Sequence, residues 1–375
     1  MSASSATTTS EADLGFMDAA LSLARRGLGQ TWPNPAVGCV IVKGGHVVGR
    51  GWTQAGGRPH AETQALARAG TAAEGATAYV TLEPCSHHGQ TPPCADALIG
   101  AGIVRVVAAM GDPDPRVSGR GFERLRQAGI AVVENVRRGE AEAVAAGFLL
   151  RIAAGRPLVT LKLATSLDGR IATRTGESRW ITGPAARARA HALRLSHDVI
   201  LVGSGTVAAD DPMLDVRLPG TQNAIRVRAV VDGHLRLPLT AKLVATARAR
   251  PTWLFARSDA DRARAAALDA AGVEVFRLAA AADGHLIPAD VLKGLAARGI
   301  TRVLLEGGGR LAAAFLRANL VDRVVRFGAG SVIGGDGIAA VAAFGLEKLG
   351  EAPRFVRTAL EPCDEDVLET WGRAP

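Results

Sequence analysis

The sequence contains no run close to the ~20 consecutive apolar residues that a membrane-spanning helix requires, although 48% of its 375 residues are apolar. We therefore expect no membrane partner. The first residues, Met1 to Ser10, lack both the basic and the apolar region of a secretory signal. We expect a cytoplasmic protein whose residues 1–12 form a disordered tail.

Cysteine is scarce, since the chain has only Cys39, Cys85, Cys94 and Cys363. Without a secretory context, these residues are expected to be thiols or metal ligands rather than disulfides. Cys39 lies in an apolar stretch that reads as a buried strand, and Cys363 reads as a free thiol near the end of the chain.

The first 150 residues also lack an excess of positive charge, because 13 Lys and Arg balance 13 Asp and Glu. The net charge of +8 therefore lies entirely in the remainder of the chain. A neutral first half argues against binding to a nucleic-acid backbone. The basic second half suits a small phosphorylated ligand, although solvated surface arginines explain its charge equally well.

The length predicts two domains, and helices alternate with strands on both sides of a linker at 153–157, which indicates the α/β class. We place the domains at 13–152 and 157–375. In the first half we expect helices at 14–29, 60–69 and from about 93, and strands at 37–42, 46–51, 76–82 and 103–109, with a last helix and strand before about 146. In the second half we expect strands at 158–164, 199–202, 228–231, 251–255 and 302–305, and helices at 184–195 and from the glycines 307–309 to about 319.

The most informative pattern combines His60 with Cys85 and Cys94. One imidazole and two thiolates suit Zn²⁺, and three protein ligands leave the fourth tetrahedral position open for water. An open position is typical of a catalytic site, where zinc lowers the pKa of water toward 7. The pattern His-x-Glu followed by Pro-Cys is typical of zinc deaminases, although here the second cysteine comes nine positions after the first. Pro92 and Pro93 then begin a helix whose start should favour a thiolate on Cys94.

Glu62 follows His60 by two residues, which on a helix is a rotation of roughly 200°. It is therefore poorly placed to bind the same metal as a regular helical neighbour. Close to the helix start, its side chain can still reach the water and act as the catalytic acid and base. The alternative is a closed structural zinc site with His87 or His88 as the fourth ligand, which would leave Glu62 without a role.

A glycine-rich stretch in the second half of the chain could be read as a dinucleotide-binding motif. Gly203-Ser204-Gly205-Thr206-Val207-Ala208 follows a predicted strand and fits the dinucleotide-binding pattern of Rossmann folds, with Asp232 at the end of a later strand. A Rossmann fold needs a long helix at this point, and Pro212 ends any helix after a few residues. We therefore reject this interpretation.

Over nearly its whole length, the sequence resembles those of the bifunctional riboflavin-biosynthesis deaminase-reductases of the RibD family. The matching stretches are Pro33–Cys39, His60–Glu62, Thr81–Cys94, Leu161–Arg170, Trp180–Gly183, Val202–Thr206, Asp210–Arg217 and Glu306–Gly309. The resemblance implies an N-terminal cytidine-deaminase-like three-layer domain and a C-terminal dihydrofolate-reductase-like domain. It also implies two reactions: deamination of a phosphorylated diaminopyrimidinone, and reduction of its ribosyl group to a ribityl chain with NADPH.

The resemblance further implies which residues contact each ligand. Asn34 should hold the pyrimidine in the first site. Residues expected at NADPH are Ala164, Trp180, Thr206, Asp210, Gly308 and Gly309, and those expected at the second site's substrate are Ser178, Arg194, Leu214, Arg217 and Glu306. Fixed arginine charges suit a phosphate, and glycines before a helix let backbone N–H groups approach a diphosphate, although an isolated triple glycine is more often a turn.

The chain departs from the family pattern at Asp114, where the family usually has Asn, and at 327–335, where a proline-containing segment is replaced. Two other functions stay open at this point. One is a deaminase of nucleic-acid bases with a C-terminal binding module, and the other is a structural protein stabilised by zinc. A homo-oligomer is compatible with the sequence.

Overall fold

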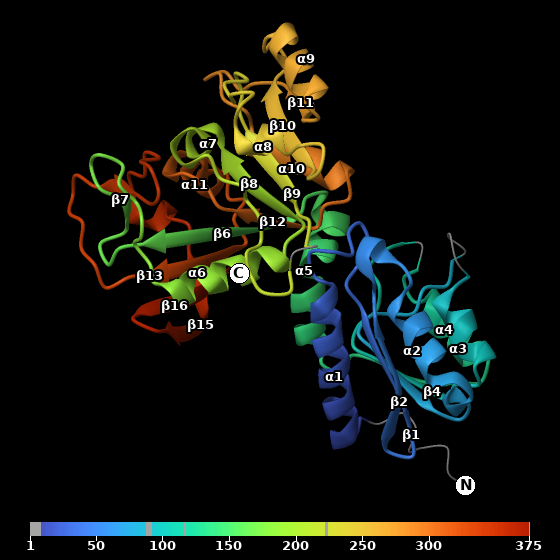
Figure 1. Cartoon of the computed structure of the whole chain (residues 1–375). Coiled ribbons are helices and arrows are strands. Elements are labelled where there is room, and N and C mark those ends of the chain that lie inside the picture. The colour runs from blue at the N-terminus through green and yellow to red at the C-terminus, as the bar shows by residue number, and fades with distance from the viewer. Residues whose placement is uncertain (1–8, 88–91, 116, 222–223, 375) are drawn as a thin grey trace. The chain divides into compact units, whose positions relative to one another are not determined.

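The computed structural model describes residues 9–87, 92–115, 117–221 and 224–374. The chain divides into two compact units between Gly155 and Arg156, and each unit is described by itself (Figure 1). The part of the expected tail that covers residues 1–8 lies outside the described residues. None of the described helices combines the length and the apolar character needed to cross a membrane.

The first unit is built on a five-stranded sheet in the order β2-β1-β3-β4-β5. Its strands are β1 (Gly38–Lys43), β2 (His46–Trp52), β3 (Thr77–Val80), β4 (Arg105–Ala108) and β5 (Ala131–Val133). Strand β1 pairs antiparallel with both neighbours, whereas β3, β4 and β5 are parallel. The carboxyl ends of the three parallel strands therefore meet at one edge, where loops that carry functional groups can gather.

The helices of the first unit are α1 (Glu11–Gly27), α2 (Ala61–Ala69), α3 (Cys94–Gly100), α4 (Arg120–Gln127) and α5 (Arg138–Ala154). Figure 1 shows α1 and α5 on one side of the sheet and α2, α3 and α4 on the other. The result is a three-layer α/β unit, with one continuous apolar core that includes Met17, Ile41, Leu98 and Leu125.

Helix α1 begins earlier than predicted, since Ser10 caps it and Glu11 is its first residue. The Ser10 hydroxyl accepts from the N–H of Asp13, and the Asp13 carboxylate accepts from the N–H of Ser10. This reciprocal capping fixes the start of the helix. Helix α5 was not predicted, and it runs into the expected linker, which leaves Gly155 in a left-handed conformation as its end.

The second unit contains a nine-stranded sheet in the order β11-β10-β9-β8-β12-β6-β13-β16-β15. Its strands are β6 (Leu158–Thr165), β8 (Val199–Gly203), β9 (Val227–Val231), β10 (Thr252–Arg257), β11 (Glu274–Leu278), β12 (Arg302–Leu305), β13 (Arg323–Gly328), β15 (Phe355–Cys363) and β16 (Asp366–Arg373). From β11 to β13 neighbouring strands are parallel, and the hairpin of β15 and β16 adds antiparallel strands at one edge. A separate pair joins β7 (Arg170–Ala172) and β14 (Ile338–Ala339).

The helices of the second unit are α6 (Pro184–Leu195), α7 (Ser204–Asp210), α8 (Lys242–Ala245), α9 (Arg262–Ala270), α10 (Pro288–Ala297) and α11 (Gly309–Arg317). Helix α6 has the bounds that the sequence predicted, and it starts with Pro184 in its first turn. Strand β12 also matches its prediction, and it lies between β8 and β6 at the centre of the sheet. These central strands bring the predicted reductase motifs to one region of the sheet.

Candidate active sites of the two units

The ligand atoms of His60, Cys85 and Cys94 all lie within 4.8 Å of one another. The Nδ1 atom of His60 is 3.3 Å from the Sγ atom of Cys94 and 3.7 Å from that of Cys85. One imidazole nitrogen and two sulfurs at such distances form a donor set that fits a single zinc ion. In the described part of the chain, no other group of three such side chains gathers in this way.

Two helix starts build this site. His60 is the residue that precedes α2, and Cys94 is the first residue of α3. Cys85 follows β3 on the loop that leads to α3, and its sulfur accepts a hydrogen bond of 3.3 Å from the backbone N–H of Cys94. The first backbone N–H of α3 therefore stabilises negative charge on the Cys85 sulfur, and the effect of the helix start on a Cys94 thiolate stays a prediction.

The hydrogen bond between the two thiols shifts their pKa values in opposite directions. A hydrogen bond from the Cys94 side chain lowers the pKa of Cys85 to about 4, while donation of that hydrogen bond raises the pKa of Cys94. Hydrogen bonding with Cys85 also raises the pKa of His60. Zinc is held by deprotonated thiols, so binding of zinc at this cluster would release protons.

Glu62 lies in the first turn of α2, and only 4% of its surface is exposed. Burial and the neighbouring Cys85 thiolate raise its pKa to about 7, and its carboxyl forms a hydrogen bond with Cys94. A carboxyl group with a pKa near neutrality can both accept and return a proton at cellular pH. Its position beside the ligands therefore suits the role that the sequence suggested.

The other predicted features of this site have distinct positions. His87 is not part of the three-residue cluster, and His88 lies outside the described residues. Cys39 is fully buried in β1, as expected for a core residue. Asn34 is partly exposed and donates from its side-chain amide to the carbonyl oxygen of Gly57 at 2.9 Å, which fixes the orientation of the amide.

Sequence reasoning missed the role of Glu83, two residues before the first cysteine. Its buried carboxylate accepts hydrogen bonds from the backbone N–H groups of Asp112, Gly119, Gly121 and Phe122, at 2.8–3.4 Å. These bonds tie the loop before α4 and the start of α4 to the Pro84–Cys85 segment. The available signal was an acidic residue within an otherwise apolar run beside the metal motif.

The second candidate site is centred on Arg194 and Glu306, which form a bidentate ion pair with N···O distances of 2.7 and 2.8 Å. Arg194 comes from α6 and Glu306 follows β12, so the pair joins helix and sheet. Arg194 also donates to the carbonyl oxygen of Asp215 at 2.5 Å. Because Arg194 and Lys162 lie close by, the pKa of the buried Glu306 falls below its usual value in spite of its burial.

Lys162 was not among the predicted site residues. It lies on β6, and burial lowers its pKa while the nearby Glu306 opposes that shift. Its position in the middle of the motif Leu161–Arg170 was the available signal, but a lysine in an alternating strand pattern is usually a solvated residue.

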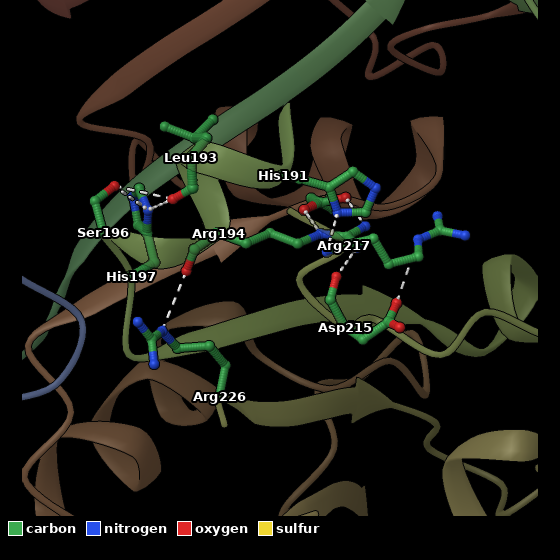
Figure 2. A network of polar contacts seen from close by, with 9 residues as sticks. His191, Leu193, Arg194, Ser196, His197, Asp215, Arg217 and Arg226 are labelled. Atoms are coloured by element: carbon green, nitrogen blue, oxygen red, sulfur yellow. Dashed lines mark hydrogen bonds and ion pairs between the residues drawn. The ribbon is translucent and has the colours of Figure 1, made fainter. Parts of the chain in front are cut away.

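Figure 2 shows the contacts of Arg217 with Asp215 and with His191 of α6. Its backbone N–H donates to Nδ1 of His191 at 3.3 Å, and its guanidinium lies 3.6 Å from the Asp215 carboxylate. Because Nδ1 accepts this bond, the neutral imidazole of His191 carries its proton on Nε2. The Arg217 side chain is 65% exposed, which leaves it accessible to an anionic ligand.

Leu214 adopts a positive φ of 51°, but its side chain is 5% exposed and packs into the apolar core. The residue as a whole is therefore buried, and its contact with substrate stays a prediction. Ser178 lies in the connection between β7 and α6 and is partly exposed.

Three of the predicted cofactor residues, Thr206, Gly308 and Gly309, lie together at the turn that leads from β12 into α11. Gly308 has a φ of 61°, which favours glycine, and a Cβ atom on Gly308 would lie 3.3 Å from Oγ1 of Thr206. Gly309 is the first residue of α11, and the exposed Gly308 before it leaves backbone open beside Thr206 of α7. This arrangement fits a diphosphate.

The remaining cofactor candidates lie on neighbouring elements. Ala164 is on β6, and Asp210 is the last residue of α7. Trp180 is 65% exposed, with the Arg187 guanidinium 4.4 Å from its ring centroid. An exposed tryptophan is available for stacking on a planar ligand.

Helix α7 has seven residues and ends at Asp210, and the next residue, Asp211, has a φ of 39°. Asp232 is buried and accepts a hydrogen bond from the N–H of Leu237, so it stabilises a turn. The rejection of a Rossmann fold is thus consistent with the structure.

Comparisons with known proteins agree with this division. Residues 10–110 match the family described as the cytidine and deoxycytidylate deaminase zinc-binding region, and residues 157–368 match the RibD C-terminal domain. The riboflavin biosynthesis protein RibD of Escherichia coli K12 is 46% identical over 365 residues, which cover 94% of this chain and 97% of that protein.

Solved structures show the same fold over the whole chain. RibD of Acinetobacter baumannii is 37% identical, with a TM-score of 0.87, and the match covers 97% of this chain and 99% of that one. A diaminohydroxyphosphoribosylaminopyrimidine deaminase/5-amino-6-(5-phosphoribosylamino)uracil reductase from Thermotoga maritima is 33% identical, with a TM-score of 0.84 and coverage of 97% and 99%. The predicted α/β fold class is confirmed, with its deaminase-like unit followed by its reductase unit. The chain belongs to the RibD family, the zinc- and NADPH-dependent bifunctional deaminases and reductases of riboflavin biosynthesis.

Proposed function

We propose that the first unit hydrolyses an amino group of 2,5-diamino-6-(5-phosphoribosylamino)pyrimidin-4(3H)-one, and that the second unit then reduces the ribosyl group of the product to ribityl. The cluster of His60, Cys85 and Cys94 with the buried Glu62 beside it carries the first part of this proposal. The relative from Thermotoga maritima, whose name includes both activities, supports the presence of both reactions in one chain.

In the first site, Nδ1 of His60 and the sulfurs of Cys85 and Cys94 would hold zinc. When bound, zinc acidifies water at its open position and so supplies a nucleophile at neutral pH. Glu62 accepts the proton of that water, and its raised pKa of about 7 lets it release the proton to the ring nitrogen of the substrate. A second proton transfer by the same carboxyl allows ammonia to leave, so that water and amine become carbonyl and ammonia.

In the second site, Arg217 offers an accessible guanidinium for the substrate phosphate, and the Arg194–Glu306 pair presents fixed polar groups to the ribosyl chain. The turn at Gly308 and Gly309, with Thr206, would hold the NADPH diphosphate. When bound, NADPH supplies the hydride for the reduction.

The proposed substrate is a small phosphorylated pyrimidine, and we infer that the enzyme acts in the cytoplasm without a nucleic-acid partner. The balance of charge in the first 150 residues supports this choice over a deaminase of nucleic-acid bases. A gel-shift assay with structured RNA tests the choice, since tight and salt-sensitive binding would favour the alternative.

The two-step proposal is tested by the masses of the products that form with and without NADPH. With zinc and NADPH, the purified protein should convert the diaminopyrimidinone to the ribityl product. Without NADPH, the deaminated but unreduced compound should accumulate, and removal of zinc with a chelator should stop its formation. Failure to form any deaminated compound with zinc present would overturn the proposal.

A further inference from the structure

The segment Ser331–Ala342, which we call the crossing segment, leaves β13 and runs along the hairpin formed by β6 and β7. The N–H of Leu167 donates to the carbonyl oxygen of Ser331 at 2.7 Å, and the N–H of Ala340 donates to that of Gly169 at 3.0 Å. Between these two bonds, β14 pairs with β7. The hairpin therefore supports the crossing segment along most of its length.

The far end of the crossing segment lies against the glycine turn at the start of α11. The N–H of Ala342 donates to the carbonyl oxygen of Gly309 at 3.0 Å. A Cβ atom on Gly309 would lie only 2.7 Å from the carbonyl oxygen of Ala339, so the two backbones are in close contact. Any displacement of the crossing segment would consequently change the environment of this turn.

One side chain fastens the middle of the crossing segment to the hairpin. The carboxylate of Asp168 accepts hydrogen bonds from the backbone N–H groups of Ile333 at 3.1 Å and Gly334 at 2.7 Å. The hydroxyl of Ser166 donates to the same carboxylate at 2.6 Å and orients it. These hydrogen bonds, above all the one from Ser166, lower the pKa of Asp168 to about 2, so the carboxylate stays charged at any physiological pH.

The exposure of Asp168 argues against a role in the core. Its side chain faces solvent, and the segment that it holds is itself largely exposed at Ser331, Val332 and Asp336. A charged carboxylate that accepts hydrogen bonds from two consecutive backbone N–H groups restricts the conformation of the backbone at those two residues. What it fixes is the part of the chain that leads to the glycine turn.

We propose that Asp168 is a positioning residue of the reductase, which holds the crossing segment against Gly309 and thereby fixes one wall of the NADPH-binding site. The proposal rests on the assignment of NADPH to this turn. It also gives a function to part of the segment at 327–335, where the sequence departs from the family pattern: Ile333 and Gly334 are held through their backbone N–H groups, whereas Phe327 is held through its buried side chain.

The test compares Asp168→Asn with Asp336→Asn in the full-length protein. Asn at 168 removes the charge and replaces one acceptor oxygen by a donor that faces backbone N–H groups. Asp336 carries the same charge within the crossing segment, but its carboxylate forms a 3.7 Å ion pair with Arg174 in which both side chains are about 70% exposed. Asp336→Asn is therefore a matched control that should behave like the unmodified protein.

For Asp168→Asn, hydrogen-deuterium exchange should show faster exchange of the amides at Ile333 and Gly334. The KM for NADPH should rise about tenfold, the order expected for loss of a charge-assisted hydrogen bond, with kcat changed by less than about twofold. Asp168→Glu keeps the charge and should recover part of both effects. The deaminase rate of the same samples should not change, which checks that the protein is intact.

Two results would overturn the role of Asp168: unchanged exchange at the two amides, or faster exchange with an unchanged KM for NADPH. If Asp168→Asn does not fold, the same two measurements on Asp168→Glu decide, because lengthening the side chain displaces the carboxylate while keeping its charge. An unmodified protein that shows no NADPH-dependent reduction would instead contradict the proposed function, so the two failures are distinguishable.

Discussion

The two candidate sites of this protein both lie on sheets with parallel strands, but their residues come from different parts of the sequence in different ways. In the first unit, the three candidate ligand atoms and the carboxyl that we propose to be catalytic come from two short stretches, His60–Glu62 and Cys85–Cys94, and most of their surface is buried. In the second unit, the contributing residues are spread from Lys162 to Gly309 on strand ends, helices and loops. The first site is thus nearly complete in local sequence, whereas the second exists only once the nine-stranded sheet has formed.

The difference extends to electrostatics. In the first site, burial above all raises the pKa of Glu62 to about 7, and a hydrogen bond from the Cys94 side chain lowers the pKa of Cys85 to about 4. In the second site, the Arg194–Glu306 pair stabilises both charges, and the pKa of Glu306 falls. A site that transfers protons keeps a carboxyl close to neutrality, and a site that binds an anion and orients a substrate keeps its charges fixed.

The largest effect should come from Glu62→Gln, which removes the proton carrier without a change in size. Deamination should fall by about 10²–10⁴-fold, the usual contribution of a general acid-base group. The zinc content should remain at one ion per chain, since Glu62 is not among the three ligands. Deamination rates and metal analysis of the purified variant measure both quantities.

Glu74→Gln is a suitable control, because Glu74 is an exposed residue of the same unit and the change is chemically identical. Reduction of substrate that has already been deaminated should proceed at the unmodified rate in both variants. Deamination by Glu62→Gln within about threefold of the normal rate would contradict the role of Glu62, given the size of the expected loss.

The sequence predicted much of the first unit because its signals are local. The glycine pair after β1 predicted the hairpin of β1 and β2, and Pro93 predicted the start of α3. That the N–H of Cys94 donates to the sulfur of Cys85 could not be predicted, because it depends on how the loop between the two cysteines folds back. The role of Glu83 was missed for a related reason, since its four N–H partners lie 29–39 positions away in sequence.

In the second unit, strands with strong apolar runs such as β8 and β12 were predicted, and α6 was predicted to the residue. Strands β13, β15 and β16 were not. Strand β15 is mostly exposed and forms a sheet edge, so it lacks the alternation that marks a strand with one buried face. Leu214 shows the limit of motif transfer, because a residue that the family motif assigns to the substrate lies buried in the apolar core.

A smaller effect is expected from Arg194→Lys, which keeps the charge but cannot form the bidentate pair with Glu306. The kcat/KM of the reductase should fall by about tenfold, since one charge-assisted hydrogen bond is lost. Deamination should not change, because Arg194 belongs to the second unit. Steady-state kinetics of each half-reaction give both values.

Arg189→Lys provides the matched control on the same helix. Arg189 is 60% exposed and lies 3.8 Å from Glu361, so its replacement should leave both activities unchanged. Equal reductase activity in Arg194→Lys and the control would show that the bidentate geometry is not needed.

The smallest effect on activity is expected from Asp13→Asn in the first unit. This change should instead lower the stability of the unit. The buried Asp13 carboxylate accepts from Arg105 at 2.7 and 2.9 Å and from the Tyr79 hydroxyl at 2.8 Å. Asparagine cannot replace this pair, and the loss should cost about 2 kcal/mol. For a unit of this size, the midpoint of thermal inactivation of the deaminase should fall by about 5 °C, with the midpoint of the reductase unchanged.

The pH dependence of this loss has a definite sign. The Arg105 guanidinium holds the pKa of Asp13 well below its usual range, so its stabilisation is fully present above the unfolded pKa of about 4 and is lost as the pH falls through the folded pKa. The difference between the unmodified protein and Asp13→Asn should therefore be constant from pH 6 to 8 and smaller at pH 3. Asp18→Asn, on the exposed side of the same helix, should show no such difference. A difference of equal size at pH 3 and pH 7 would mean that the ion pair does not stabilise the first unit through the charge of Asp13.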